Sequence, residues 1–139
     1  MLTEQLATLL ESTQALQVLL EEEKTCLKEK KFDNLNTLLF NKQKLLQSIN
    51  SINALVSTEQ NLATIQESSE LSTTKENIQS RLQECKKNNE INGRLIELSM
   101  KSNKHLMQLL TQAKGKNSVT YDQKGALNRA SLLGDNIEV

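Results

Sequence analysis

Apolar side chains recur at alternating steps of four and three residues through roughly the first 30 positions of the chain. The positions of this seam are Leu2, Leu6, Leu9, Thr13, Leu16, Leu20, Glu23 and Leu27, of which Thr13 and Glu23 are polar. The spacing keeps the side chains on one face of an α-helix, unlike the strict alternation of a half-buried strand. Leu10, Leu19 and Cys26 widen the seam into a stripe. The pattern therefore predicts a helix that packs in a bundle rather than in a two-stranded coil.

Two further segments repeat this spacing. The second begins near Phe32, with Asp33 as its predicted N-cap, and its seam is Phe32, Leu35, Leu39, Lys42, Leu46, Ile49, Asn53 and Val56. The third is expected over about 74–113, with Thr73-Thr74-Lys75-Glu76 as a capping box. A short turn at 31–34 would separate the first two helices, although no proline or glycine marks it and one bent rod is the alternative. The polar stretch 57–74 is predicted to be the fraying end of the second helix followed by a mobile connection.

The composition agrees with an all-α fold. The 139 residues contain no proline, four glycines and 2% aromatic residues. A sheet protein would need frequent turns and many β-branched or aromatic strand residues. Leu, Glu, Lys and Gln, which lose little rotamer freedom in a helix, are abundant instead. We expect a three-helix bundle over 1–113 and a flexible tail over 114–139.

Charge and the scarcity of reactive groups exclude several function classes. Seventeen basic and seventeen acidic residues cancel, which is atypical of a nucleic-acid-binding module. The single histidine, His105, is predicted to be a solvated helix residue, and Cys26 and Cys85 to be small buried hydrophobes rather than metal ligands. No phosphate-binding loop or nucleophile motif occurs. We therefore expect no catalytic residue, no metal and no cofactor, and a function in binding.

The chain is also expected to remain in the cytoplasm. No apolar run approaches the roughly 20 residues that span a bilayer. The Leu-rich N-terminal segment carries Glu4 and Glu11 and lacks the basic region of a signal peptide. Neither secretion nor stable membrane insertion is predicted.

The third segment has an unusually polar middle. Its seam includes Asn89, Asn92, Ser99 and Asn103, where a uniform core would carry Leu. Two interpretations stay open: a groove that binds another helix, or a device that fixes the register of a homo-oligomeric coiled coil. Gly93, which costs about 1 kcal/mol relative to Ala in mid-helix, indicates either close helix packing or the same groove.

The tail after residue 113 contains a helical pattern of its own. Ala126, Ala130, Leu133 and Ile137 are spaced by four, three and four residues, and Leu127 lies beside them. This spacing places them on one face of a helix that could form on a partner. Simple disorder without a partner is the alternative.

Three features together resemble the FlgN-type flagellar export chaperones. The first is the Leu-rich helical opening followed by the segment from Asp33 to Leu46. The most specific is the string Asn89-Glu90-Ile91-Asn92-Gly93-Arg94-Leu95-Ile96, which is similar to the family's N-x-x-N-G-x-L-I signature. The last is Tyr121-Asp122-Gln123-Lys124-Gly125 ahead of a short C-terminal segment. The resemblance covers essentially the whole chain.

This resemblance implies an elongated antiparallel bundle of long helices that binds hook–filament junction (hook-associated) proteins in the cytosol. Such chaperones keep their clients unpolymerised and deliver them to the flagellar type III export apparatus. The client would contribute a C-terminal amphipathic helix, and Tyr121 would be available to the export gate. The predicted client-binding residues are Asn89, Asn92, Gly93, Leu95, Ile96, Leu127, Leu133 and Ile137. A structural homo-oligomeric coiled-coil adaptor is the competing interpretation.

Overall fold

The computed structural model describes residues 1–108 and 110, and its elements are all helical. The elements are α1 (Leu2–Lys28), the 3₁₀ turn η1 (Phe32–Asn34), α2 (Leu35–Val56), α3 (Glu59–Glu67) and α4 (Ser69–Ser102). The all-α prediction is confirmed. The prediction of only three helices is incomplete, because η1 and the short α3 stand between the long helices.

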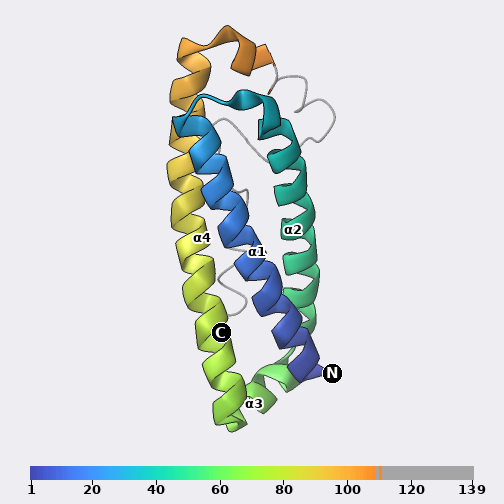
Figure 1. Cartoon of the computed structure of the whole chain (residues 1–139). Coiled ribbons are helices and arrows are strands. Elements are labelled where there is room, and N and C mark those ends of the chain that lie inside the picture. The colour runs from blue at the N-terminus through green and yellow to red at the C-terminus, as the bar shows by residue number, and fades with distance from the viewer. Residues whose placement is uncertain (109, 111–139) are drawn as a thin grey trace.

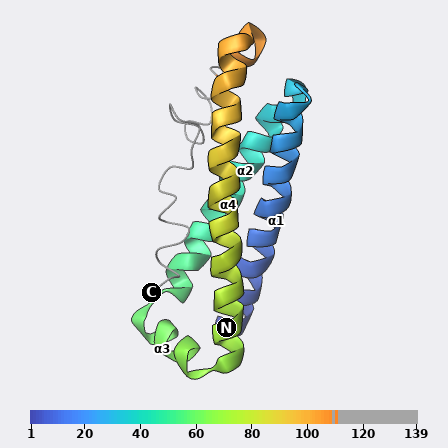
Figure 2. The same cartoon turned by 90° about the vertical axis from the view of Figure 1, so that its left-hand side faces the viewer.

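The three long helices run side by side, up, down and up (Figure 1). Helix α1 is antiparallel to α2 and parallel to α4, and it packs extensively against both. The backbones of α2 and α4 approach each other closely at very few points within the described residues. In the view turned by 90°, α3 crosses the end of the bundle at which α1 begins and joins α2 to α4 (Figure 2). Helix α1 is therefore the central element of the fold.

A tight turn separates α1 from α2, as the sequence predicted. Lys30 has a positive φ of 57°, and Lys31 N–H donates to Cys26 O at 2.9 Å while Lys30 N–H donates to Leu27 O at 3.4 Å. These two bonds form a Schellman motif, which satisfies the last carbonyls of a helix, here with lysine at the left-handed position that glycine usually occupies. Asp33 is not the N-cap of α2, because it lies inside η1.

The stretch 57–74, predicted to be a frayed helix end and a mobile connection, instead contains α3 and the start of α4. Thr58 caps α3 by accepting from Asn61 N–H at 3.2 Å. Ser68 caps α4 by accepting from Leu71 N–H, also at 3.2 Å. Ile65, at 2% exposure, is buried in the core and fixes α3 across the bundle end.

Because α4 begins at Ser69, the residues of the predicted capping box lie within the helix and do not cap it. Thr73 and Thr74 lie in the interior of the helix, where their hydroxyls donate to Ser69 O at 2.9 Å and Glu70 O at 3.1 Å. The far end also differs from the prediction, since α4 stops at Ser102. Asn103 has extended backbone, and its Oδ1 accepts from Leu106 N–H at 3.0 Å, which caps a further helical turn. The predicted end of this helix at Ala113 lies outside the described residues.

Candidate functional site: a polar layer in the bundle core

The apolar core of the bundle consists of two clusters at different heights. The α3-end cluster contains Leu6, Leu9, Leu16, Leu20, Ile49, Val56, Ile65, Ile78, Leu82 and Cys85. The turn-end cluster, beside the α1–α2 turn, contains Leu27, Phe32, Leu35, Leu39, Ile96, Leu106 and Leu110. Each long helix contributes seam residues to both clusters, as the four-three spacing requires.

Four buried polar residues occupy the level between the two clusters, and we call them the polar layer: Glu23, Lys42, Asn89 and Asn92. None is more than 1% exposed. On α1, Glu23 is the seam position between Leu20 and Leu27, which belong to different clusters. The other two helices supply their polar seam positions at the same level, so the layer crosses the whole bundle.

The layer is joined by direct contacts across all three long helices. Lys42 Nζ lies 3.1 Å from Glu23 Oε2 and 3.4 Å from Oε1, and it donates to Asn89 Oδ1 at 2.8 Å. Asn92 Nδ2 lies 2.9 Å from both Glu23 Oε1 and the backbone oxygen of Leu20. Asn89 Nδ2 and Asn92 Oδ1 have no hydrogen-bond partner among the described residues. The four side chains are therefore linked by direct contacts, but not all of their buried polar atoms have hydrogen-bond partners.

Burial perturbs the lysine at the centre of the layer. Desolvation lowers the pKa of Lys42 from 10.5 to about 8, and the neighbouring Glu23 carboxylate only partly offsets this effect. The ammonium form still predominates at neutral pH, because its pKa remains above 7. A buried ion pair of this kind contributes little net stability, but removal of one partner leaves an unpaired charge in the core. The arrangement suits a device that fixes how the three helices align.

The structure places the sequence-predicted site residues in two groups. Asn89, Asn92, Gly93 and Ile96 are buried inside the bundle, and Leu95 is half-buried against the turn-end cluster. In the chain alone they form core rather than an open groove, so a role in client contact stays a prediction. The other predicted residues lie outside the described part of the chain: Leu127, Leu133, Ile137 and Tyr121.

The pairing of Glu23 with Lys42 was missed from the sequence. Both were recognised as polar seam positions, but nothing in the spacing alone assigns their relative height. The available signal was their opposite charge on seams of two successive helices joined by a tight turn. Because such helices are antiparallel neighbours, the two charges had to share one interior.

The remaining reactive groups form no further site within residues 1–108 and 110. No group of three or more His, Cys, Asp or Glu side chains there could hold a metal ion, and no helix is long and apolar enough to cross a membrane. Cys85 is fully buried in the α3-end cluster, and burial raises its pKa to about 12. Its prediction as a small buried hydrophobe is confirmed, whereas Cys26 is only partly buried.

Fold and site together define a class: a small helical bundle whose long helices are aligned by a polar layer. The sequence matches the family described as FlgN protein over residues 1–129. The chain belongs to this family of flagellar export chaperones, which is not a family of enzymes. No curated protein and no solved structure gives a significant match. The resemblance drawn from the asparagine–glycine string is confirmed at the level of the family.

Proposed function

We propose that this chain is a cytosolic chaperone that binds hook-associated flagellar proteins, prevents their premature assembly and delivers them to the type III export apparatus. The observation that carries this proposal is the family match over residues 1–129, which includes the bundle, the asparagine–glycine string and Tyr121.

The client-binding surface proposed here combines part of α4 with the tail. Leu127, Leu133 and Ile137 would fold against an amphipathic client helix, since such helices bind through apolar residues at helical spacing. Asn89 and Asn92 are held in the core by Lys42 and Glu23. A client that reaches them must therefore separate α2 from α4, and the sparse backbone contact between those two helices favours this route. Tyr121 would remain available to the export gate.

Calorimetric titration with the C-terminal fragment of a hook-associated protein tests the proposal. The full chain and a chain ending at Ala113 would be compared, with circular dichroism confirming that both are folded. We expect tight binding by the full chain and a many-fold loss on truncation. Equal binding by both would refute the role of the tail, and no binding by either would refute this client class.

Two adjacent leucines offer a matched pair of variants for the tail. Leu133 lies on the predicted apolar face with Ala126 and Ile137, whereas Leu132 lies off it at about 100° per residue. Leu133→Ser is expected to weaken client binding, and Leu132→Ser to leave it nearly unchanged. Equal losses would show that general hydrophobicity, rather than a helical face, accounts for the affinity.

The competing function is a homo-oligomeric coiled-coil adaptor. The seam asparagines Asn89 and Asn92 find partners on α1 and α2 of the same chain, so a second copy is not needed to bury them. Sedimentation equilibrium of the client-free chain separates the two functions. A monomer is expected for the chaperone, and a stable dimer would favour the adaptor.

A further inference from the structure

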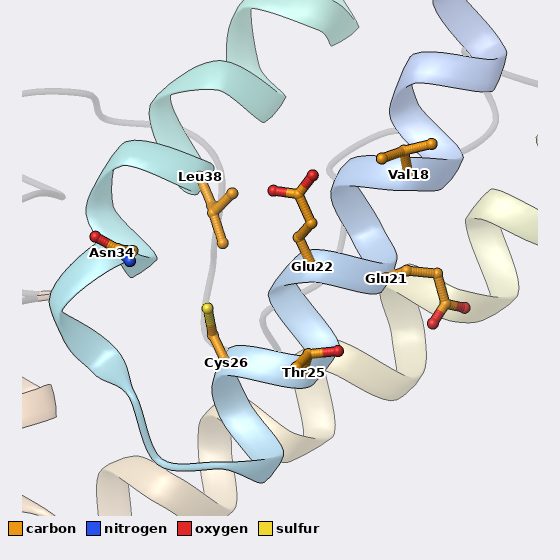
Figure 3. A pocket seen from close by; sticks show the side chains of 7 residues that line it. All are labelled: Val18, Glu21, Glu22, Thr25, Cys26, Asn34 and Leu38. Carbon is orange, nitrogen blue, oxygen red and sulfur yellow. The ribbon is translucent and has the colours of Figure 1, made fainter.

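An open groove of about 500 Å³ lies between α1 and the first turns of α2 (Figure 3). From α1 it is lined by Val18, Glu21, Glu22, Thr25 and Cys26, and from η1 and α2 by Asn34 and Leu38. These residues recur at steps of three, four and seven along α1 and at a step of four on the second segment. The groove is therefore one face of each of two antiparallel helices, away from the seam that builds the core.

The floor of this groove is apolar. Val18 is 59% exposed although it is β-branched and apolar, and Leu38 is buried yet belongs to neither core cluster. Glu22, Cys26 and Leu38 are directed toward one another across the groove, whereas Glu21 projects to its outer side (Figure 3). On α1 the apolar part extends from Val18 to Cys26, which is about 12 Å at 1.5 Å per residue. That length accommodates about two turns of a docked helix.

The charged residues that line the groove are two carboxylates of α1, Glu21 and Glu22. Glu21 and Glu22 are both exposed, and neither forms an ion pair within the described residues. Lys24 and Lys28 follow on the same helix but do not line the groove, and Lys31 is paired with Glu29 at 3.1 Å. Consistent with this surplus, burial and the nearby carboxylates of Glu29 and Glu22 raise the pKa of the Cys26 thiol. An apolar side chain flanked by cations would complement both parts of this surface.

The geometry points to this groove as a docking site for a basic amphipathic helix of another protein, which would place one large apolar side chain between Val18 and Leu38 and a Lys or Arg beside Glu22. The bound helix would pack on α1 and α2 as a fourth long helix of the bundle. This surface lies on a different face from the α4 residues assigned to the client, and it does not depend on the proposed chaperone function.

A cationic helix is favoured over other occupants by the charge of the rim. An acidic helix would bring like charges beside Glu21 and Glu22 in a partly desolvated groove, which is unfavourable. A small apolar ligand would leave the carboxylates unused, because the groove is open along its length. The third alternative, a second copy of this chain, is decided by the oligomeric state.

The test uses the full chain and a fluorescent, amphipathic peptide with Leu on one face and Lys on the other. Fluorescence anisotropy measures its affinity, and the alkylation rate of Cys26, located by mass spectrometry, reports whether the groove is occupied. We expect saturable binding, protection of Cys26, and loss of about tenfold or more in affinity for Val18→Asn, which removes the apolar side chain without adding charge. Cys85 provides the internal control, because it is fully buried and should not react in the folded chain.

Charge-matched variants separate the groove from general attraction. E21Q/E22Q removes two carboxylates from the rim, whereas E4Q/E11Q removes two exposed carboxylates elsewhere on α1. The first pair should weaken the Lys peptide and flatten its salt dependence, and the second should leave both unchanged. Equal affinity for a peptide with Glu in place of Lys, or unchanged binding by V18N, would overturn the proposal. A client-free dimer that the peptide dissociates would also overturn it, by assigning the groove to a second copy.

Discussion

Lys42→Met is expected to destabilise the bundle by about 3–5 kcal/mol, the usual cost of removing one partner of a buried ion pair. Glu23 is fully buried, and without Lys42 its carboxylate keeps only the Asn92 amide as a hydrogen-bond donor among the described residues. Asn89 Oδ1 would lose the 2.8 Å bond that it accepts from Lys42. Methionine fills much of the volume of the lysine chain, so the loss is electrostatic rather than a cavity effect.

Urea denaturation followed by circular dichroism at neutral pH measures this loss. Lys44→Met is the matched control, because it makes the same chemical change two residues away on an exposed part of α2. Lys44 Nζ lies 4.6 Å from the centre of the Phe40 ring, a surface contact whose removal costs about 1 kcal/mol or less. The reasoning would be refuted if K42M were no less stable than K44M.

The double variant E23L/K42M tests whether the loss belongs to the pair. Removal of both charges replaces a buried ion pair with apolar side chains, a change that is often neutral or stabilising. We expect E23L/K42M to recover most of the stability lost in K42M, with Asn92 still bonded to Leu20 O. Additive losses in E23L and K42M would show that the two residues act independently.

Three further outcomes follow from the same structure. Because folding lowers the pKa of Lys42 from 10.5 to about 8, the unfolded chain binds more protons between these values, so this group should raise the unfolding free energy by roughly 3 kcal/mol from pH 8 to 10.5. The difference in unfolding free energy between the unmodified chain and K42M, followed against pH, isolates the contribution of Lys42. It removes that of Cys85, whose raised pKa lowers the unfolding free energy above pH 9.0. A thiol reagent should label Cys26 but not Cys85 in the folded chain and both in urea, as mass spectrometry would show, and labelling of Cys85 without urea would contradict its burial. Ser68→Ala should cost about 1 kcal/mol in urea denaturation through loss of the α4 cap, whereas Thr73→Ala inside the helix should cost less, and equal losses would contradict the cap.

The long helices were predictable because their apolar spacing is sustained over many turns. The seams identified buried positions even where the residue is polar, since Glu23, Lys42 and Asn89 all lie in the core. The turn between α1 and α2 was also located correctly, although its left-handed residue is Lys30 rather than glycine. The spacing of apolar residues predicts these helices well because each long helix packs against the bundle through the same face along its length.

The short helix α3 could not be predicted in the same way. Its apolar residues, among them Leu62 and Ile65, are too few to define a face within nine positions, and their burial comes from the end of a bundle already formed. Two capping signals also competed near the start of α4. Ser68 succeeded over Thr73 and Thr74 because it follows the end of α3, where the backbone is already extended.

The seams predicted that Glu23, Lys42, Asn89 and Asn92 face inward, but not that they contact one another. The seam of the third segment identified Asn89 and Asn92 as unusual polar positions. Whether they face a partner, a second copy or their own bundle depends on how the three long helices are aligned along the bundle axis. That alignment is set by the length of the α1–α2 turn and by α3, and the residue spacing within one helix predicts neither. The groove at Val18 was missed because its residues lie outside every seam.

The polar layer also divides the cooperative unit of the fold. Apolar contact is continuous within each cluster, but at the level of Glu23 and Lys42 the helices are joined by directed polar contacts. We therefore expect the turn-end cluster to open locally at a lower free energy than global unfolding. Amide hydrogen exchange would then be faster around Phe32 and Ile96 than around Leu9 and Ile78. The α3 end of the bundle would then stay folded while the helices at the turn end separate.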